Sequence, residues 1–185
     1  NVLNVFDDRS FIFATSGRDV FRGTSGRDLL DGGADADRLI GLGGNDTYRV
    51  DNVGDVIVEA EGEGNDTALV YGDFVLSAGA HVETIKALYQ EQAVNITGNE
   101  LGNDITGNEA TNILSGAGGD DVIHGGNVIY LQLARGDTLN GGGGDDQLHG
   151  GGAGDRFNGG AGFDSLVESE YAGVDIADEG DECGQ

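Results

Sequence analysis

The chain has 185 residues and a net charge of −25, with 36 glycines, no proline and a single cysteine. The glycines follow no three-residue period, so a collagen triple helix is excluded. So many carboxylates make nucleic acid a poor partner, and they destabilise a compact state unless cations are bound. No apolar run approaches the ~20 residues that a membrane-spanning helix needs, so we expect no transmembrane segment.

The first residues are apolar and precede a regular repeat. Phe11, Ile12 and Phe13 predict a strand. We interpret residues 1–13 as an N-terminal cap on a repeat array, and the end of a preceding domain is the alternative. Because the chain begins with Asn1 rather than Met, we expect it to be a fragment or a processed product.

A nine-residue period fills residues 14–49, the first repeat block. Each unit has a glycine-rich turn, an aspartate at its sixth position and an apolar or aromatic residue at its eighth. The aspartates are Asp19, Asp28, Asp37 and Asp46, and the eighth-position residues are Phe21, Leu30, Leu39 and Tyr48. A short fixed period of this kind is typical of a solenoid.

Residues 50–97 lose this period. They carry β-rich segments separated by turns, and one repeat-like turn survives at Gly62–Asp66. Because strand follows turn without any helical pattern, we interpret this stretch as an irregular spacer made of wider coils of the same solenoid. An inserted subdomain is the alternative.

The period returns over residues 98–167, the second repeat block. Its sixth-position aspartates are Asp121, Asp137, Asp146, Asp155 and Asp164. Two units carry Asn103 and Asn112 in that place, which weakens the expectation of a site near them. An apolar insert, residues 127–133, interrupts one unit. It could form a protruding hairpin, a contact surface or a part of the core, and the sequence does not choose between them. The acidic tail, residues 168–185, has little to bury.

Nine residues suit one tight turn followed by a strand of three residues. Because side chains alternate between the two faces of a strand, only the eighth-position residue points inward. Two units then make an 18-residue coil with two short parallel sheets. The sequence therefore predicts an all-β fold, a right-handed parallel β-roll or β-solenoid with an enlarged or irregular middle section. Glycines at positions one, two and four are expected to supply the positive φ angles of the turns.

The sixth-position aspartates predict metal sites. One inward residue per unit is a small core, so we expect metal binding to contribute folding free energy. Stacking places aspartates from units two apart on the same edge, which pairs Asp19 with Asp37, Asp28 with Asp46, Asp137 with Asp155 and Asp146 with Asp164. Their carboxylates and the turn carbonyls form a set of oxygen ligands that suits several Ca²⁺ ions, whereas zinc and copper need clustered His or Cys. No catalytic arrangement stands out, so we expect no enzyme activity.

Units such as GGAGFDSLV and GGGGDDQLH match the nonapeptide G-G-x-G-x-D-x-U-x. Over 14–49 and 98–167 the chain thus resembles the RTX (repeats-in-toxin, haemolysin-type) calcium-binding proteins, and GNDTYRVDNVGDVIVEAEGEGNDTALV resembles a spacer between RTX blocks. The resemblance implies a β-roll that is unfolded without calcium, export by a type I system and folding outside the cell. It also implies calcium ligation by the sixth-position aspartates and by backbone carbonyls at positions two and four. In this chain those carbonyls belong to Gly17, Gly26, Gly33, Gly44, Gly119, Gly142, Gly144, Gly151, Gly160 and Gly162.

The resulting hypothesis is a calcium-binding module of a larger secreted protein, located outside the cell or on its surface. The first alternative is a structural or adhesive protein that forms oligomers or filaments through the ends of the solenoid. A weaker alternative is a polysaccharide-binding module, because RTX-like modules are attached to alginate epimerases.

Overall fold

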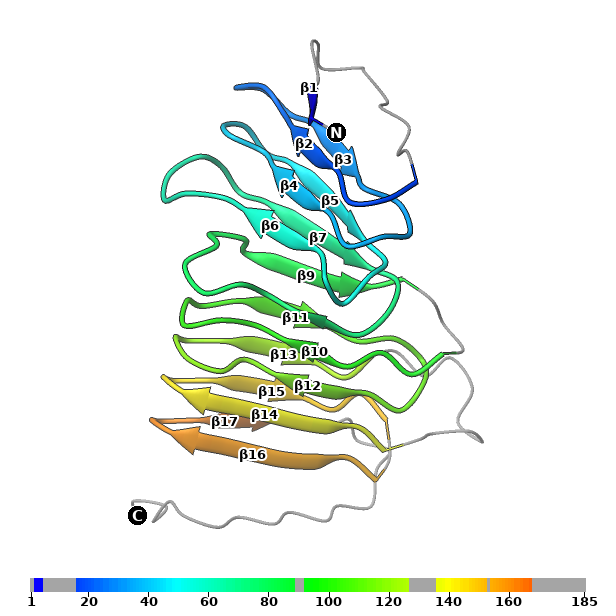
Figure 1. Cartoon of the computed structure of the whole chain (residues 1–185). Helices are drawn as coiled ribbons and strands as arrows, with labels where there is room; N and C mark the ends of the chain where they lie inside the picture. Colours follow the sequence, from blue (N-terminus) through cyan, green and yellow to red (C-terminus); the bar gives the residue numbers. More distant parts are fainter. Residues whose placement is uncertain (1, 5–15, 89–91, 127–135, 153, 168–185) are drawn as a thin grey trace.

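The computed structural model describes residues 2–4, 16–88, 92–126, 136–152 and 154–167. These residues form seventeen strands and no helix, so they contain no membrane-spanning helix. The coils stack in one column from β1 to β17 (Figure 1). The predicted all-β parallel solenoid with an irregular middle section is thereby confirmed. The strand expected at Phe11–Phe13, the insert 127–133 and the tail 168–185 lie outside the described residues.

The strands form three sheets, and every pair of neighbouring strands is parallel. The N-terminal sheet contains β1 (Val2–Asn4), β2 (Val20–Arg22), β4 (Arg38–Ile40) and β6 (Val56–Val58). The long sheet contains β3 (Leu29–Asp31), β5 (Thr47–Val50), β7 (Thr67–Val70), β9 (Thr84–Ala87), β11 (Asp104–Thr106), β13 (Val122–His124), β15 (Gln147–His149) and β17 (Ser165–Val167). The C-terminal sheet contains β8 (Phe74–Val75), β10 (Ile96–Thr97), β12 (Ile113–Ser115), β14 (Thr138–Gly143) and β16 (Arg156–Ala161).

The core is a column of eighth-position side chains between the sheets. Phe21 is paired with Leu39 on β2 and β4, and Leu30 is paired with Tyr48 on β3 and β5, so alternate units supply opposite sheets. All four side chains are buried, while their strand neighbours are more exposed. This follows from the alternation of side chains along a strand. Only the last eighth-position residue, Leu166 on β17, is exposed.

The spacer supplies coils of unequal length. Strands β6 to β10 lie in residues 50–97, and β7 and β9 continue the long sheet between β5 and β11. The ladder contacts between coils span 18 residues in the first repeat block but 20 and 17 residues across the spacer. On the opposite side, no ladder joins β6 to β8, so the N-terminal and C-terminal sheets are separate there. The long sheet alone is continuous through this step.

Most of the turn glycines at positions two and four have the predicted positive φ, with Gly26 as an exception, but those at position one do not. Gly142 and Gly144, for example, have φ angles of 117° and 132°. The first-position glycines of the described units do not have positive φ, so the prediction for position one was wrong. The reason for glycine there is steric. A Cβ on Gly23 would lie 2.7 Å from Asp28 Oδ2, because the sixth-position carboxylate folds back over the first residue of its own unit.

Candidate calcium sites

The sixth-position side chains form ladders along the edges of the roll. In each step the backbone N–H of one sixth-position residue donates to the carboxylate of its equivalent in the next coil. The structure brings together all four predicted pairs, with N···O distances of 2.8 Å (Asp19–Asp37), 2.7 Å (Asp28–Asp46), 2.7 Å (Asp137–Asp155) and 3.0 Å (Asp146–Asp164). Asp121 also pairs with Asp146, over the 25 residues of the coil that holds the insert. The aspartates therefore meet across coils, and their role as metal ligands stays a prediction.

The ladder uses Oδ1 and leaves Oδ2 buried without a hydrogen-bond partner in Asp37, Asp46, Asp66, Asp121 and Asp146. In Asp28 the unpartnered atom is Oδ1, because Oδ2 accepts from Thr24, and Glu59, outside the ladder, also buries an unpartnered oxygen. A buried acceptor without a donor costs roughly 1–3 kcal/mol, and more when it is charged. A bound cation would satisfy these oxygens, because hard divalent cations take carboxylate ligands.

Burial also shifts the titration of these carboxyl groups. Desolvation raises the pKa of Asp121 and of Asp137 to about 7, even though the ladder N–H bonds lower it, and neighbouring carboxylates raise it further. The pKa of Asp37 and that of Asp146 are raised for the same main reason. The charged forms therefore lack a counter-charge, which a bound cation would supply.

Glycine carbonyls form further columns on the turns. The carbonyl oxygen of Gly26 lies against the Cα of Gly44, and that of Gly119 lies against Gly144. At position two, the carbonyl of Gly142 lies against Gly160 in the same way. A Cβ would collide with each oxygen, so close stacking of the coils requires glycine at the receiving position. Columns of carbonyl oxygens thus run beside the carboxylate ladders, with Gly17, Gly33, Gly151 and Gly162 on turns of the same positive-φ type.

Among the described residues, three units have a different turn, which we name the closed turn. In each, the second-position residue donates its N–H to its own unit's sixth-position side chain, and its side chain accepts the N–H of position four. These second-position residues are Thr24, Asn99 and Asn108. Gly26 lies in the first closed turn and does not have the positive φ expected of it. In these three units the hydroxyl or amide at position two closes the turn. Positive φ at position two is not limited to glycine, since Leu42 and Ala117 have φ angles of 81° and 83°.

Asn103 and Asn112 complete two of these closed turns with fully bonded amides. Asn103 donates Nδ2–H to the Val82 carbonyl at 2.9 Å, and its Oδ1 accepts from Asn99 at 3.0 Å. Asn112 donates to the Val94 carbonyl at 2.9 Å. An amide supplies both a donor and an acceptor, so these steps leave no side-chain oxygen for a cation to satisfy.

The sequence pattern missed ligand-type residues in the spacer. Asp55 accepts the N–H of Asp37, Asp66 accepts that of Asp46, and Glu83 accepts that of Asp66. Asp55 was detectable, because it follows Asp46 at the same nine-residue spacing. The Gly62–Asp66 turn was visible, but it did not show that Asp66 continues the ladder. Glu83 follows no spacing rule, and its position emerges only from the stacking of the coils.

The fold and these ladders define a class of repeat solenoid whose turns present stacked carboxylates and carbonyls to cations. The RTX calcium-binding nonapeptide repeat, in four copies, matches residues 13–48, 97–127 and 134–166. This match covers more than half of the chain, so the chain belongs to the RTX calcium-binding nonapeptide repeat family. No curated protein and no solved structure matches it. The family assignment confirms the resemblance on which calcium was predicted.

Proposed function

We propose that the chain is a calcium-binding module of a secreted protein, and that it folds on calcium binding outside the cell. RTX repeats are typical of secreted proteins. The net charge of −25 favours an unfolded chain where calcium is scarce, because the carboxylates repel one another. Calcium would hold the ladders together by bridging carboxylates and turn carbonyls from neighbouring coils. We assign the chain no catalytic role.

The unpartnered, buried carboxylate oxygens carry this proposal. A self-sufficient fold would pair these atoms, as the amides of Asn103 and Asn112 do in the same ladders. Instead, Asp121 and Asp146 each bury an oxygen that no donor reaches. Such atoms are tolerated where binding free energy is part of the folding free energy.

Circular dichroism with and without a calcium chelator tests the proposal. At a pH above neutral, where the carboxylates are charged, the β signal should be lost in chelator and return with calcium. A chain that stays folded there in excess chelator would refute the metal-dependent account. The double replacement of Asp146 and Asp164 by Ala should lower the number of bound calcium ions. Asp104→Ala is the matched control, since it also removes a carboxylate from the long sheet but from an exposed position. An unchanged stoichiometry in the double variant would disprove ligation by that pair.

A second candidate function is assembly through the end of the roll. On the described residues around β17, Phe163 is 91% exposed and Leu166 is 39% exposed, although Leu166 occupies an inward position of the repeat. Exposed apolar residues at a strand edge favour pairing with another chain. Light scattering and electron microscopy in calcium separate the two candidates. Filaments would support the structural protein, and a stable monomer would support the appended module.

A further inference from the structure

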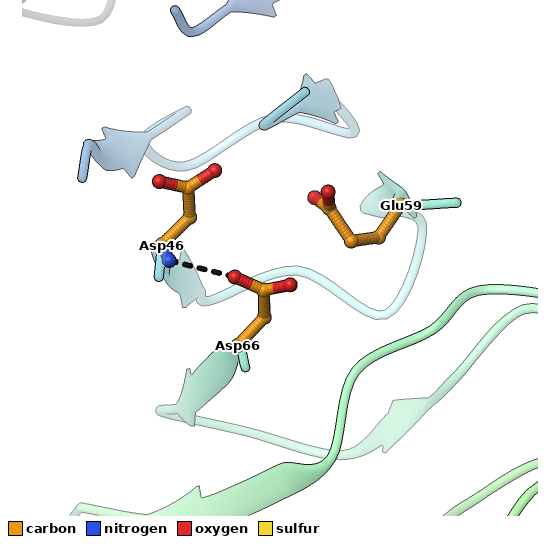
Figure 2. Close-up of side chains that lie close together, drawn as sticks. All are labelled: Asp46, Glu59 and Asp66. Carbon is orange, nitrogen blue, oxygen red and sulfur yellow. Dashed lines mark hydrogen bonds between the residues drawn. The ribbon is translucent and has the colours of Figure 1, made fainter. Parts of the chain in front are cut away.

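One cluster of acidic side chains adds a third carboxylate, Glu59, to the ladder step between Asp46 and Asp66, and it joins two sheets. Asp46 precedes β5 and Asp66 precedes β7 in the long sheet, whereas Glu59 follows β6 in the N-terminal sheet. Their side chains point into the same space (Figure 2). One oxygen of each carboxylate lies within 4.8 Å of the others, and each residue is at most 3% exposed.

Each of the three carboxylates has one oxygen engaged and one free. Asp46 N–H donates to Asp66 Oδ1 at 2.6 Å, and the Tyr48 hydroxyl donates to Glu59 Oε2. The free atoms are Asp46 Oδ2, Glu59 Oε1 and Asp66 Oδ2, and all three are buried. Each carboxylate of the cluster therefore has a buried oxygen that no donor satisfies.

The charges around Glu59 reinforce this picture. Burial is the main cause that raises the pKa of Glu59 to about 8, and the neighbouring charges of Asp66, Asp46 and Glu63 raise it further. The pKa of Asp46 is raised to about 6, again mainly by burial. Gly41 borders the cluster, and a Cβ there would collide with Tyr48, Asp46 and Glu59. The space between the carboxylates is thus buried and acidic, and it exists because residue 41 has no side chain to fill it.

We propose that Asp46, Glu59 and Asp66 form a separate calcium site between the two sheets, with Glu59 as a ligand from outside the nonapeptide pattern. Calcium–oxygen distances are about 2.3–2.6 Å, so ligands on opposite sides of one ion lie about 4.6–5.2 Å apart, which accommodates the separation in the cluster. Backbone carbonyls or water would complete the shell. The inference rests on the proposed function, because it assumes that the chain folds in calcium.

This site would lie at the C-terminal end of the N-terminal sheet. Glu59 follows β6, the last strand of that sheet, and among the described residues no ladder joins β6 to β8. An ion held by Glu59, Asp46 and Asp66 would tie the end of β6 to β5 and β7. It would therefore fasten the end of β6 to its own coil and to the coil before it, while a backbone hydrogen bond from His81 N–H to the Glu59 carbonyl spans the step toward β8.

Terbium luminescence tests the proposal on the full chain. Tb³⁺ replaces Ca²⁺ at oxygen sites and emits when a nearby tyrosine is excited, and the Tyr48 hydroxyl is hydrogen-bonded to Glu59. Glu59→Gln keeps the shape of the side chain but removes its charge. We expect it to bind one calcium ion fewer and to lose most of the tyrosine-sensitised emission. The control Glu61→Gln makes the same change at an exposed position two residues away and should match the wild type.

The outcomes separate this inference from the proposed function. A wild type that binds no calcium refutes both. If the wild type folds in calcium and the Glu59→Gln variant binds the same number of calcium ions with the same emission, the site is refuted. The three residues would then be a protonated carboxyl cluster. If Glu59→Gln fails to fold in saturating calcium, Tyr48→Phe decides, because it removes the sensitiser and retains all three carboxylates. Loss of emission in that variant supports the site, and retained emission overturns it.

Discussion

Replacement of Gly141 by Ala tests the steric role of the first-position glycine. A Cβ at this position would collide with Asp146 Oδ2 and would lie 2.5 Å from the carbonyl oxygen of Gly159 in the next coil. Gly141 does not have a positive φ, so the backbone itself accepts alanine. Any damage therefore comes from displacement of the carboxylate and of the neighbouring coil.

The size of the effect follows from the packing of these atoms. Forcing one methyl group into a closely packed site costs typically about 1–3 kcal/mol. Since each 1.4 kcal/mol is tenfold, the folding equilibrium at fixed calcium should shift about 5–150-fold toward the unfolded chain. Displacement of Asp146 Oδ2, which is buried and unpartnered, should also weaken calcium binding at its step of the ladder.

Gly143→Ala provides the matched control two residues away. No atom lies within 4 Å of a Cβ there, and the φ angle is not positive. Alanine at a compatible glycine position stabilises by about 0.4–1 kcal/mol, through the entropy of the unfolded chain. Calcium titrations followed by circular dichroism should show a higher calcium midpoint for Gly141→Ala only. Equal midpoints for the two variants would refute the steric explanation.

Three further predictions concern the ladders and the core. Asn103→Asp replaces a hydrogen-bond donor to the Val82 carbonyl with a carboxylate. In calorimetric titrations the variant should need more calcium to fold and should bind one extra ion. An unchanged titration would contradict the role of the amide. Without calcium, the pKa of Asp121 and that of Asp137 are raised from 3.8 to about 7 in the folded chain. Between these two pH values the folded chain binds more protons than the unfolded chain. The contribution of these groups to the free energy of unfolding is therefore present at low pH and is lost as the pH rises through about 7. Acidification in chelator from about pH 8 to about pH 5 should then increase the β signal in circular dichroism, and a decrease would contradict the direction of these shifts. Leu114→Ala should lower the free energy of unfolding, measured with denaturant in calcium, by about 2–5 kcal/mol. The same change at the adjacent, exposed Ile113 should alter it by no more than about 0.5 kcal/mol. Equal losses in the two variants would contradict the inward position of Leu114.

The repeat made the regular parts of the fold predictable. A period of nine with one apolar position predicts three-residue strands with one inward side chain, and Leu148 on β15 occupies such a position. The pairing of Asp146 with Asp164 follows from the same period, because two units form one coil. These features depend on local geometry that every unit repeats, so the sequence pattern carries them.

The irregular parts were less accessible, because they depend on contacts between coils. First-position glycine was assigned to backbone conformation, whereas Gly141 is required by the side chain of Asp146. Glu59 enters the acidic cluster from a strand of the other sheet, and no spacing rule relates it to Asp46 or Asp66. The closed turn of Thr24 depends on its hydrogen bonds with Gly26 and Asp28, which the nine-residue period does not indicate.

The gap between β6 and β8 has a consequence for mechanical strength. A force that pulls the two ends of the roll apart is shared by two columns of backbone hydrogen bonds where both sheets are continuous. Between the coil of β6 and β7 and the coil of β8 and β9, the long sheet carries most of the load, helped by one backbone hydrogen bond from His81 N–H to the Glu59 carbonyl. Extension should therefore open the roll at this step first, into two segments that each keep their own paired strands. The spacer would then be the first part of the roll to yield under load. An ion held by Glu59, Asp46 and Asp66 would strengthen the segment on the N-terminal side of this step rather than the step itself.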